Sequence, residues 1–351
     1  MYSDRRALYA ELEKEFNSRL LVYITSDRRG MEAQIAGDVI DFFIEHLDKL
    51  EKTETISLYL YTRGGNTASA WNIVNLLRMF CHKLQVIVPH KAHSAGTIIS
   101  LGANEIVMTK QATLSPIDPS INTQLNPKNP DGLGTYSVSV EAVNGYLEYA
   151  KNILEINDPS ALASIYLKLS EYVHPLVLGQ AYRSRAQIQM LATKLLKNQP
   201  IGEDKIKEIT DFLCSESGGH DYTINRDEAK QILGLNIITP TEKQYRIIKK
   251  IYDDVADELQ LGKNFELSEI NGEYAVRRGL LESIIGGSDY FITEGRVVHL
   301  QIPNTPIGTQ DAIQNRISFE GWRHEDILDK SDYETEGKGE VVYERSDEFQ
   351  M

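Results

Sequence analysis

Short apolar runs alternate with stretches of helical apolar spacing along the first 110 residues of the chain. The runs are 20–26 (LLVYITS), 56–62 (ISLYLYT), 83–88 (KLQVIV) and 105–110 (EIVMTK), and each is typical of a buried strand. The stretch after the first run has its apolar residues on one face of a helix, at Ile35, Val39, Phe42, Phe43 and Leu47. This alternation predicts parallel strands joined by right-handed crossovers, with ligands at the carboxyl ends of the strands.

The rest of the chain predicts an organisation in three parts. The α/β domain covers 1–238, and the Asn, Pro and Gly residues near 122–136 indicate a long loop or insertion within it, with helices resuming beyond. A C-terminal extension of unknown role covers 239–323, with one clear helix followed by short mixed segments. The segment 324–351 has ten acidic residues against three Lys or Arg, which predicts a mobile acidic tail.

Charge and composition exclude several classes of function. The 351 residues include 37 Lys or Arg and 51 Asp or Glu, a net charge of −14, which argues against nucleic acid or an anionic membrane surface as a partner. Cys81 and Cys214 lie far apart in the sequence and match no metal-ligand spacing, so neither a zinc site nor a disulfide framework is expected. No apolar run approaches the ~18 residues of a spanning helix. We therefore expect a cytoplasmic protein with no membrane insertion.

The candidate chemistry centres on Ser94 in the stretch PHKAHSAGTIISLGANEIV. A serine at a strand-to-helix junction lies beside unpaired backbone N–H groups, which can stabilise the negative charge that develops during acyl transfer. The Ala95 N–H is the expected first donor. The second is expected from Gly64 and Gly65 in the RGG turn, which precedes Ser94 by one helix and one strand. From this stretch alone, a serine that only caps its helix is the favoured interpretation.

Four separated motifs carry a family resemblance. The segments LYTRGGN, HKAHSAGTIISLGANEIVM, LSPIDPS and GGHDYTINRDEAKQILGL, within residues 20–238, resemble the serine dehydrogenase proteinase group of the Clp protease and crotonase-like superfamily, which is related to signal peptide peptidases. The resemblance implies a Clp/crotonase-like α/β fold and a serine peptidase that cleaves peptides or unfolded proteins without a cofactor. This chain departs from the group at Arg63, where the relatives usually have Pro, and an N-terminal membrane helix of the kind that many relatives carry is not expected here.

The resemblance also implies partners. Related folds assemble into rings, so we expect a homo-oligomer formed through the helices after Val138. The sequence has no Walker-type phosphate loop. Unfolding of substrates by ATP hydrolysis would therefore need a separate unfoldase.

The base that activates the serine is not determined by the motifs. Where Clp proteases place a catalytic histidine, this chain has Ile117 or Asp118, so a copied triad is not expected. His220 is the favoured base, because its GGHDYTI motif is shared with the relatives, and Asp118 or Asp221 could orient its ring. Asp118 is also a candidate substrate-binding residue.

Other polar residues remain as alternatives or as structural groups. Lys151 follows Ser94 at a separation close to that of the Ser-Lys dyad of signal peptide peptidases, and a desolvated lysine can act as a base. His174 is expected to pack within a helical region, and His93 to form a wall of the pocket. Arg183 and Arg185 could bind a substrate carboxylate or a neighbouring subunit, or lie in solvent.

Two other functional classes remain open. Crotonase-like folds also use paired backbone N–H groups to stabilise thioester enolates, although such an enzyme needs no serine nucleophile. A non-catalytic oligomeric scaffold is favoured by Arg63 and by the missing Clp-type histidine. A dinucleotide site is the weakest alternative, because RGGN lacks the G-x-G-x-x-G spacing.

Overall fold

A mixed eight-stranded sheet forms the centre of the computed structural model, which describes residues 1–117, 120–129, 134–216, 222–303 and 309–325. The strand order is β10-β5-β3-β2-β1-β11-β12-β13. Neighbours from β10 to β1 pair in parallel, and those from β1 to β13 are antiparallel. The strands are β1 (Arg19–Thr25), β2 (Thr53–Tyr61), β3 (Cys81–Val88), β5 (Glu105–Met108), β10 (Ile237–Ile238), β11 (Gly272–Ser283), β12 (Gly287–Pro303) and β13 (Thr309–Glu325). The predicted α/β fold class is confirmed.

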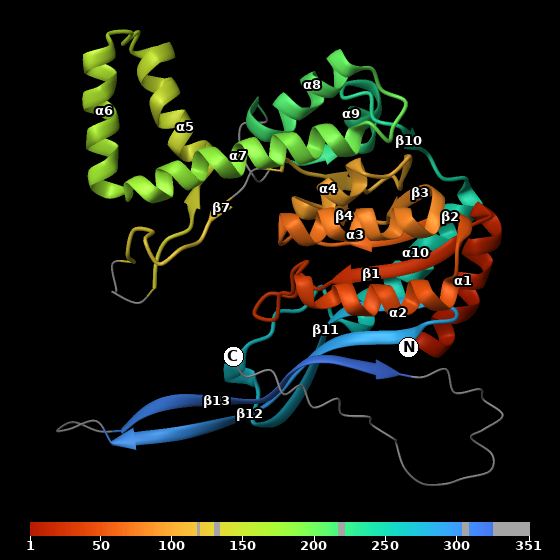
Figure 1. Cartoon of the computed structure of the whole chain (residues 1–351). Helices are drawn as coiled ribbons and strands as arrows, with labels where there is room; N and C mark the ends of the chain where they lie inside the picture. Colours follow the sequence, from red (N-terminus) through yellow and green to blue (C-terminus); the bar gives the residue numbers. More distant parts are fainter. Residues whose placement is uncertain (118–119, 130–133, 217–221, 304–308, 326–351) are drawn as a thin grey trace, which may run out of the picture.

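Helices cover both faces of the parallel strands (Figure 1). The apolar residues of α2, α3, α4, α7, α8 and α9 pack on one face, and those of α1 and α10 pack on the other. The bounds are α1 (Tyr2–Phe16), α2 (Ile40–Leu50), α3 (Thr67–Phe80), α4 (Ala95–Leu101), α7 (Pro175–Leu196), α8 (Glu203–Asp211), α9 (Arg226–Gln231) and α10 (Glu242–Glu258). Because both faces are covered, β1, β2 and β3 are nearly continuous apolar runs rather than alternating ones.

The period of two along a strand sends neighbouring residues into opposite cores. On β2, Leu58 and Leu60 join the core beneath α2 and α3, whereas Tyr59 and Tyr61 join the core beneath α1 and α10. The C-terminal extension therefore completes the second core, because α10 lies within it. Its remaining segments are not short, since β11 to β13 continue the main sheet from β1.

Small strands support the loops at the carboxyl ends of β2 and β3. The strands β4 (Lys91–Ala92), β6 (Thr113–Leu114) and β9 (Ile224–Asn225) form a second sheet in the order β4-β6-β9. Thr62 extends this support, because it forms a parallel bridge with Ala92. The loop after β2 is thus tied directly to the loop that carries Ser94.

A helical arm projects from the core along the first half of α7 (Figure 1). It comprises α5 (Val140–Glu148), the π-helix Tyr149–Ile153, α6 (Pro159–Tyr172) and the first half of α7. The predicted loop near 122–136 joins the short strands β7 (Ser120–Ile121) and β8 (Val138–Ser139), which pair at the base of the arm. A small core of Ile121, Val138, Val140, Val177 and Ala181 attaches the arm.

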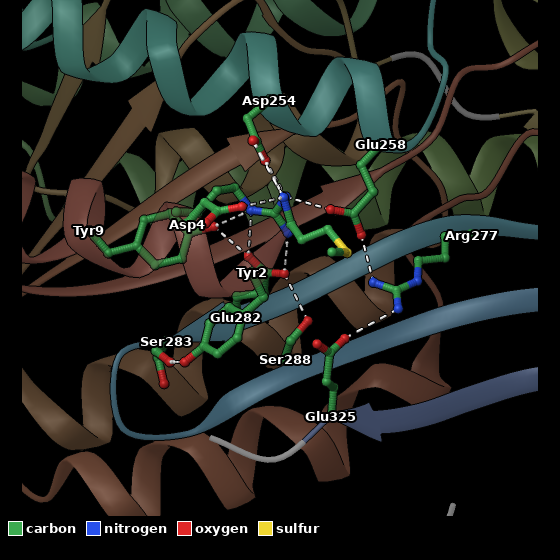
Figure 2. Close-up of polar contacts among 12 residues, drawn as sticks. Tyr2, Asp4, Tyr9, Asp254, Glu258, Arg277, Glu282, Ser283, Ser288 and Glu325 are labelled. Carbon is green, nitrogen blue, oxygen red and sulfur yellow. Dashed lines mark hydrogen bonds and ion pairs between the residues drawn. The ribbon is translucent and has the colours of Figure 1, made fainter. Parts of the chain in front are cut away.

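A buried ionic cluster joins the two termini of the sheet domain. The Arg5 side chain of α1 is fully buried and donates to both oxygens of Glu282 on β11, at 3.1 and 2.6 Å. It also pairs with Asp254 and Glu258 of α10, and Tyr9 donates to Glu282. Figure 2 shows these carboxylates converging from α10 and β11. The cluster fixes α1 and α10 against the C-terminal strands.

Candidate active site

Ser94 lies in a strained turn between β4 and α4. Its backbone has φ 51° and ψ −113°, and the Gly96 N–H donates to the His93 carbonyl at 2.8 Å to close the turn. A positive φ at a residue with a Cβ costs on the order of 1–3 kcal/mol and persists only where the surroundings enforce it. Within the described residues, the Ser94 side chain makes no capping bond to α4. The geometry therefore does not support a serine that serves only as a helix cap.

Hydrogen bonds to buried hydroxyl groups stabilise this turn. The Ser94 N–H donates to Ser115 Oγ at 2.7 Å. The Ser115 N–H in turn donates to Thr97 Oγ1 at 3.1 Å, and that oxygen lies 2.9 Å from the carbonyl oxygens of both Ala92 and Ser115. Sequence reasoning missed Ser115, although it stands in the LSPIDPS motif. Only its contact with Ser94 distinguishes it from any other buried serine.

The two glycines of the RGG turn lie where backbone segments approach closely. Gly64 has φ +116°, and a Cβ on it would lie 2.7 Å from the Ser94 Cβ and 3.2 Å from the Ala95 nitrogen. Gly65 has φ +147°, and a Cβ there would lie 2.3 Å from the Ile35 carbonyl oxygen. The structure thus brings Gly64 directly against Ser94. At Gly65, glycine is required by the Ile35 backbone.

The N–H groups of this turn differ in what they bind. The Gly64 N–H donates to Thr62 Oγ1 at 2.9 Å, and that hydroxyl lies 2.6 Å from Thr25 Oγ1. By contrast, no described residue accepts a hydrogen bond from the N–H of Gly65 or of Ala95. Unpaired N–H groups next to a serine hydroxyl can bind a developing oxyanion.

Two predicted site residues, His220 and Asp118, lie outside the described residues. The described residues on either side of their segments are anchored close to Ser115. The Ile117 N–H donates to the Leu213 carbonyl at 3.0 Å, and Ile224 on β9 pairs with Leu114 on β6. The described residues next to each segment therefore lie beside Ser115, the residue that accepts the Ser94 N–H.

Lys151 is not brought to Ser94 within the single chain. It is exposed on the π-helix that continues α5, and α5 belongs to the arm that projects from the sheet (Figure 1). His174 is an exposed N-cap whose Nδ1 accepts the Leu176 N–H at 3.2 Å, so the predicted packing role is wrong. His93 Nε2 lies 2.9 Å from Thr113 Oγ1. Arg185 lies 3.6 Å from Glu141 across α5 and α7.

A separate hollow of about 520 Å³ lies on the α10 side of the same strand ends. It includes Asp27, Tyr61, Lys91 and Tyr252, with Lys91 Nζ 2.7 Å from Asp27 Oδ2. His90 stacks on Tyr252, and burial, together with the charge of Lys91, lowers its pKa. Ser94 does not line this hollow.

The described residues offer neither a metal site nor a membrane-spanning helix. They hold no cluster of three or more His, Cys, Asp or Glu side chains that could bind a metal ion. None of their helices is long and apolar enough to span a membrane.

The similar curated proteins are themselves uncharacterized. Two uncharacterized proteins of Methanocaldococcus jannaschii are similar to this chain. One is 29% identical over 204 residues, covering 57% of this chain and 59% of the relative. The other is 28% identical over 200 residues, covering 56% of each. The chain thus matches under two thirds of the length of these relatives.

Solved structures with similarity to this chain are remote. One is a mutant of the 1510-N membrane-bound stomatin-specific protease in complex with a substrate peptide, with a TM-score of 0.37 and 15% identity, covering 65% of this chain and 78% of that one. Another is ClpP1 from Listeria monocytogenes, with a TM-score of 0.35 and 14% identity, covering 66% of this chain and 98% of that one.

A family profile matches the part of the chain that contains the candidate site. Residues 45–128 match the ClpP-like SDH-type serine proteinases, a range that includes Gly64, Gly65, Ser94 and Ser115. The match confirms the resemblance predicted from the motifs and supports a serine peptidase. Through the segment that carries its candidate nucleophile, the chain is similar to the ClpP-like SDH-type serine proteinases.

Proposed function

We propose that the protein is a serine peptidase that hydrolyses peptides or unfolded proteins through an acyl-enzyme on Ser94. One observation carries the proposal. Ser94 is held in a strained conformation with its hydroxyl uncommitted to capping, directly before Ala95 and against Gly64, and no described residue accepts the N–H of Ala95 or of the next glycine, Gly65. A structural serine needs neither the strain nor the unpaired donors, whereas acyl transfer uses both.

The proposed reaction has two steps. Ser94 Oγ bonds to the carbonyl carbon of the substrate and its proton passes to a base. The N–H groups of Gly65 and Ala95 hold the oxyanion, the C–N bond breaks, and the amine leaves with the proton from the base. Water then attacks the ester with the help of the same base, which releases the acid and restores Ser94. These two steps need no metal or cofactor.

His220 is the proposed base. The residues that flank its segment support this role, since Leu213 and Ile224 bond to the chain on either side of Ser115. His220 precedes Ile224 by four positions in the sequence, a span of at most about 14 Å of extended chain. Lys151 could reach Ser94 only from a second copy or after rearrangement of the arm.

Self-association through the arm is part of the proposal. Nine large apolar side chains on the arm are between 43% and 77% exposed, and α6 buries no residue within the single chain. Such a surface is typical of a protein interface. The residues are Tyr146, Tyr149, Ile153, Leu154, Tyr166, Leu167, Tyr172, Leu176 and Tyr182. Unfolding of folded substrates by ATP hydrolysis would require a separate unfoldase.

A fluorophosphonate probe tests the nucleophile. Wild-type protein should form a covalent adduct that mass spectrometry assigns to Ser94, and Ser94→Ala should form none while hydrolysing no peptide. Because Ser94 makes no capping bond, the free energy of unfolding of this variant should stay within about 0.5 kcal/mol of wild type. Absence of labelling in the wild type would favour a thioester enzyme or a non-catalytic scaffold.

The pH dependence of the same labelling reaction tests the base. If His220 accepts the proton, the rate should rise with an apparent pKa near the ~6.5 reference of histidine, and His220→Ala should abolish that rise. If Lys151 is the base, the apparent pKa of the labelling rate should be higher than this. Full labelling of His220→Ala, with loss only in Lys151→Ala, would make the protein a Ser-Lys enzyme.

A further inference from the structure

The Ser115 hydroxyl accepts a hydrogen bond from the strained backbone of Ser94. Ser115 follows β6 and is 2% exposed, and its Oγ accepts the Ser94 N–H at 2.7 Å. The Oγ also lies 2.9 Å from the Pro116 carbonyl oxygen, the acceptor for its own proton. The lone pairs of the hydroxyl oxygen are therefore left for the Ser94 N–H.

This contact acts where the backbone needs support. At φ 51° a serine relaxes toward ordinary conformations unless its neighbours prevent it. The bond from the Gly96 N–H to the His93 carbonyl closes the turn on one side. The bond to Ser115 fixes the peptide between His93 and Ser94, and so the direction in which the Ser94 side chain leaves the backbone.

The support itself is rigid. The Ser115 N–H donates to Thr97 Oγ1 at 3.1 Å, and Thr97 is fully buried on α4. The preceding residue, Leu114, pairs with Ala92 of β4 on one side and Ile224 of β9 on the other. The hydroxyl that holds Ser94 is thus fixed by three neighbouring elements.

We propose that Ser115 is a positioning residue for the reaction, because its oxygen keeps Ser94 in the conformation that presents the hydroxyl to a substrate carbonyl. The inference rests on the proposed function, since it concerns the rate at which Ser94 is acylated. Ser115 does not touch the substrate, and its effect passes through the Ser94 backbone.

The test measures acylation of the full chain by the fluorophosphonate probe, resolved into the binding constant of the probe and the maximal rate constant of labelling. Ser115→Ala should lower the maximal rate by about 10²-fold, as expected for a small displacement of a reacting group, with little change in probe binding. Ser115→Thr keeps the hydroxyl and should restore most of the rate. If Ser115 served only to fill space, Ser115→Thr would not restore the rate, because its added methyl group disturbs a buried site more than the substitution by alanine does.

Ser100→Ala is the matched control. Ser100 lies on α4 and is fully buried, but its hydroxyl donates to the Gly96 carbonyl at 2.9 Å and does not touch Ser94. This variant should lose comparable thermal stability and label at the wild-type rate. The inference is overturned if Ser115→Ala labels as fast as wild type, or if Ser115→Thr is as slow as Ser115→Ala. If wild-type Ser94 were not labelled at all, the nucleophile and this inference would fall together.

Discussion

Two buried polar clusters in this protein differ in charge and in what they leave unpaired. The hydroxyl cluster, Thr25, Thr62, Thr97 and Ser115, supports the turns of Gly64 and Ser94 and contains no charge. The ionic cluster, Arg5, Tyr9, Glu258, Arg277 and Glu282, joins α1 and α10 to the C-terminal strands (Figure 2). Both are held by short hydrogen bonds within the fold.

The ionic cluster satisfies its own members. Glu282 Oε1 accepts from Arg5 and, at 2.8 Å, from Ser288, while Oε2 accepts from Arg5 and Tyr9. Burial and the neighbouring Glu282 charge raise the pKa of Tyr9 far above its ordinary value. Such perturbed pKa values often mark active sites, yet this cluster leaves no carboxylate oxygen of Glu282 for a ligand. The uncharged cluster instead leaves the N–H groups of Gly65 and Ala95 unpaired, and unpaired donors are the better guide to function here.

Changing Gly65 should have the largest effect, because it damages the hydroxyl-supported turn itself. In Gly65→Ala the new Cβ meets the Ile35 backbone, so the turn must shift and its N–H leaves the position proposed for binding the oxyanion. Loss of one such donor costs on the order of 10²–10³ in kcat. The rate of peptide hydrolysis and the thermal unfolding temperature of the variant should both fall.

Gly272→Ala is the control for backbone strain. Gly272 also has a positive φ, +113°, but a Cβ there has open space. This variant should lose some stability and keep full activity. Near-normal kcat in Gly65→Ala would place the oxyanion donors elsewhere.

The sequence was sufficient to predict the parallel half of the fold and to single out the turn that carries Ser94. The four predicted strands match β1, β2, β3 and β5 within a few residues, since strands covered on both faces are continuous apolar runs. The strands β11 to β13 were missed. In Gly272–Ser283, for example, charged residues such as Arg277 and Arg278 interrupt the apolar pattern because they pair with side chains from other elements.

The site was predictable only where residue type reveals conformation. Glycines and a serine between small residues indicate close backbone approach, so Gly64, Gly65 and Ser94 could be selected. The roles of Thr62 and Ser115 depend on which N–H each oxygen meets across the fold. Spacing along the chain carries no such information, and for the same reason it could not place Lys151 in the arm.

Breaking the ionic cluster should reduce stability without changing the chemistry. Arg5→Met leaves Glu282 buried without its main partner, and removal of one member of a buried pair costs about 3–5 kcal/mol. Denaturant unfolding should show this loss, while the labelling rate of the remaining folded protein should equal that of wild type. Lys243→Met, which breaks an exposed pair with Glu15, should leave the free energy of unfolding nearly unchanged. A slower labelling rate in Arg5→Met would show that the ionic cluster affects the hydroxyl cluster around Ser94.

The smallest expected effect is the pH dependence that Glu258 gives to the ionic cluster. Burial alone would raise the pKa of Glu258, but the charges of Arg5 and Arg277 outweigh it and hold the pKa below its usual range. The stabilisation is therefore fully present above the unfolded pKa of about 4.3 and is lost as the pH falls through the folded value. In Arg277→Gln the free energy of unfolding, measured in urea between pH 5 and pH 3, should fall less steeply with decreasing pH than in wild type. Arg246→Gln, which removes an exposed pair with Glu242, should leave the slope unchanged. Equal slopes in Arg277→Gln and wild type would mean that Glu258 does not carry the acid sensitivity of the cluster.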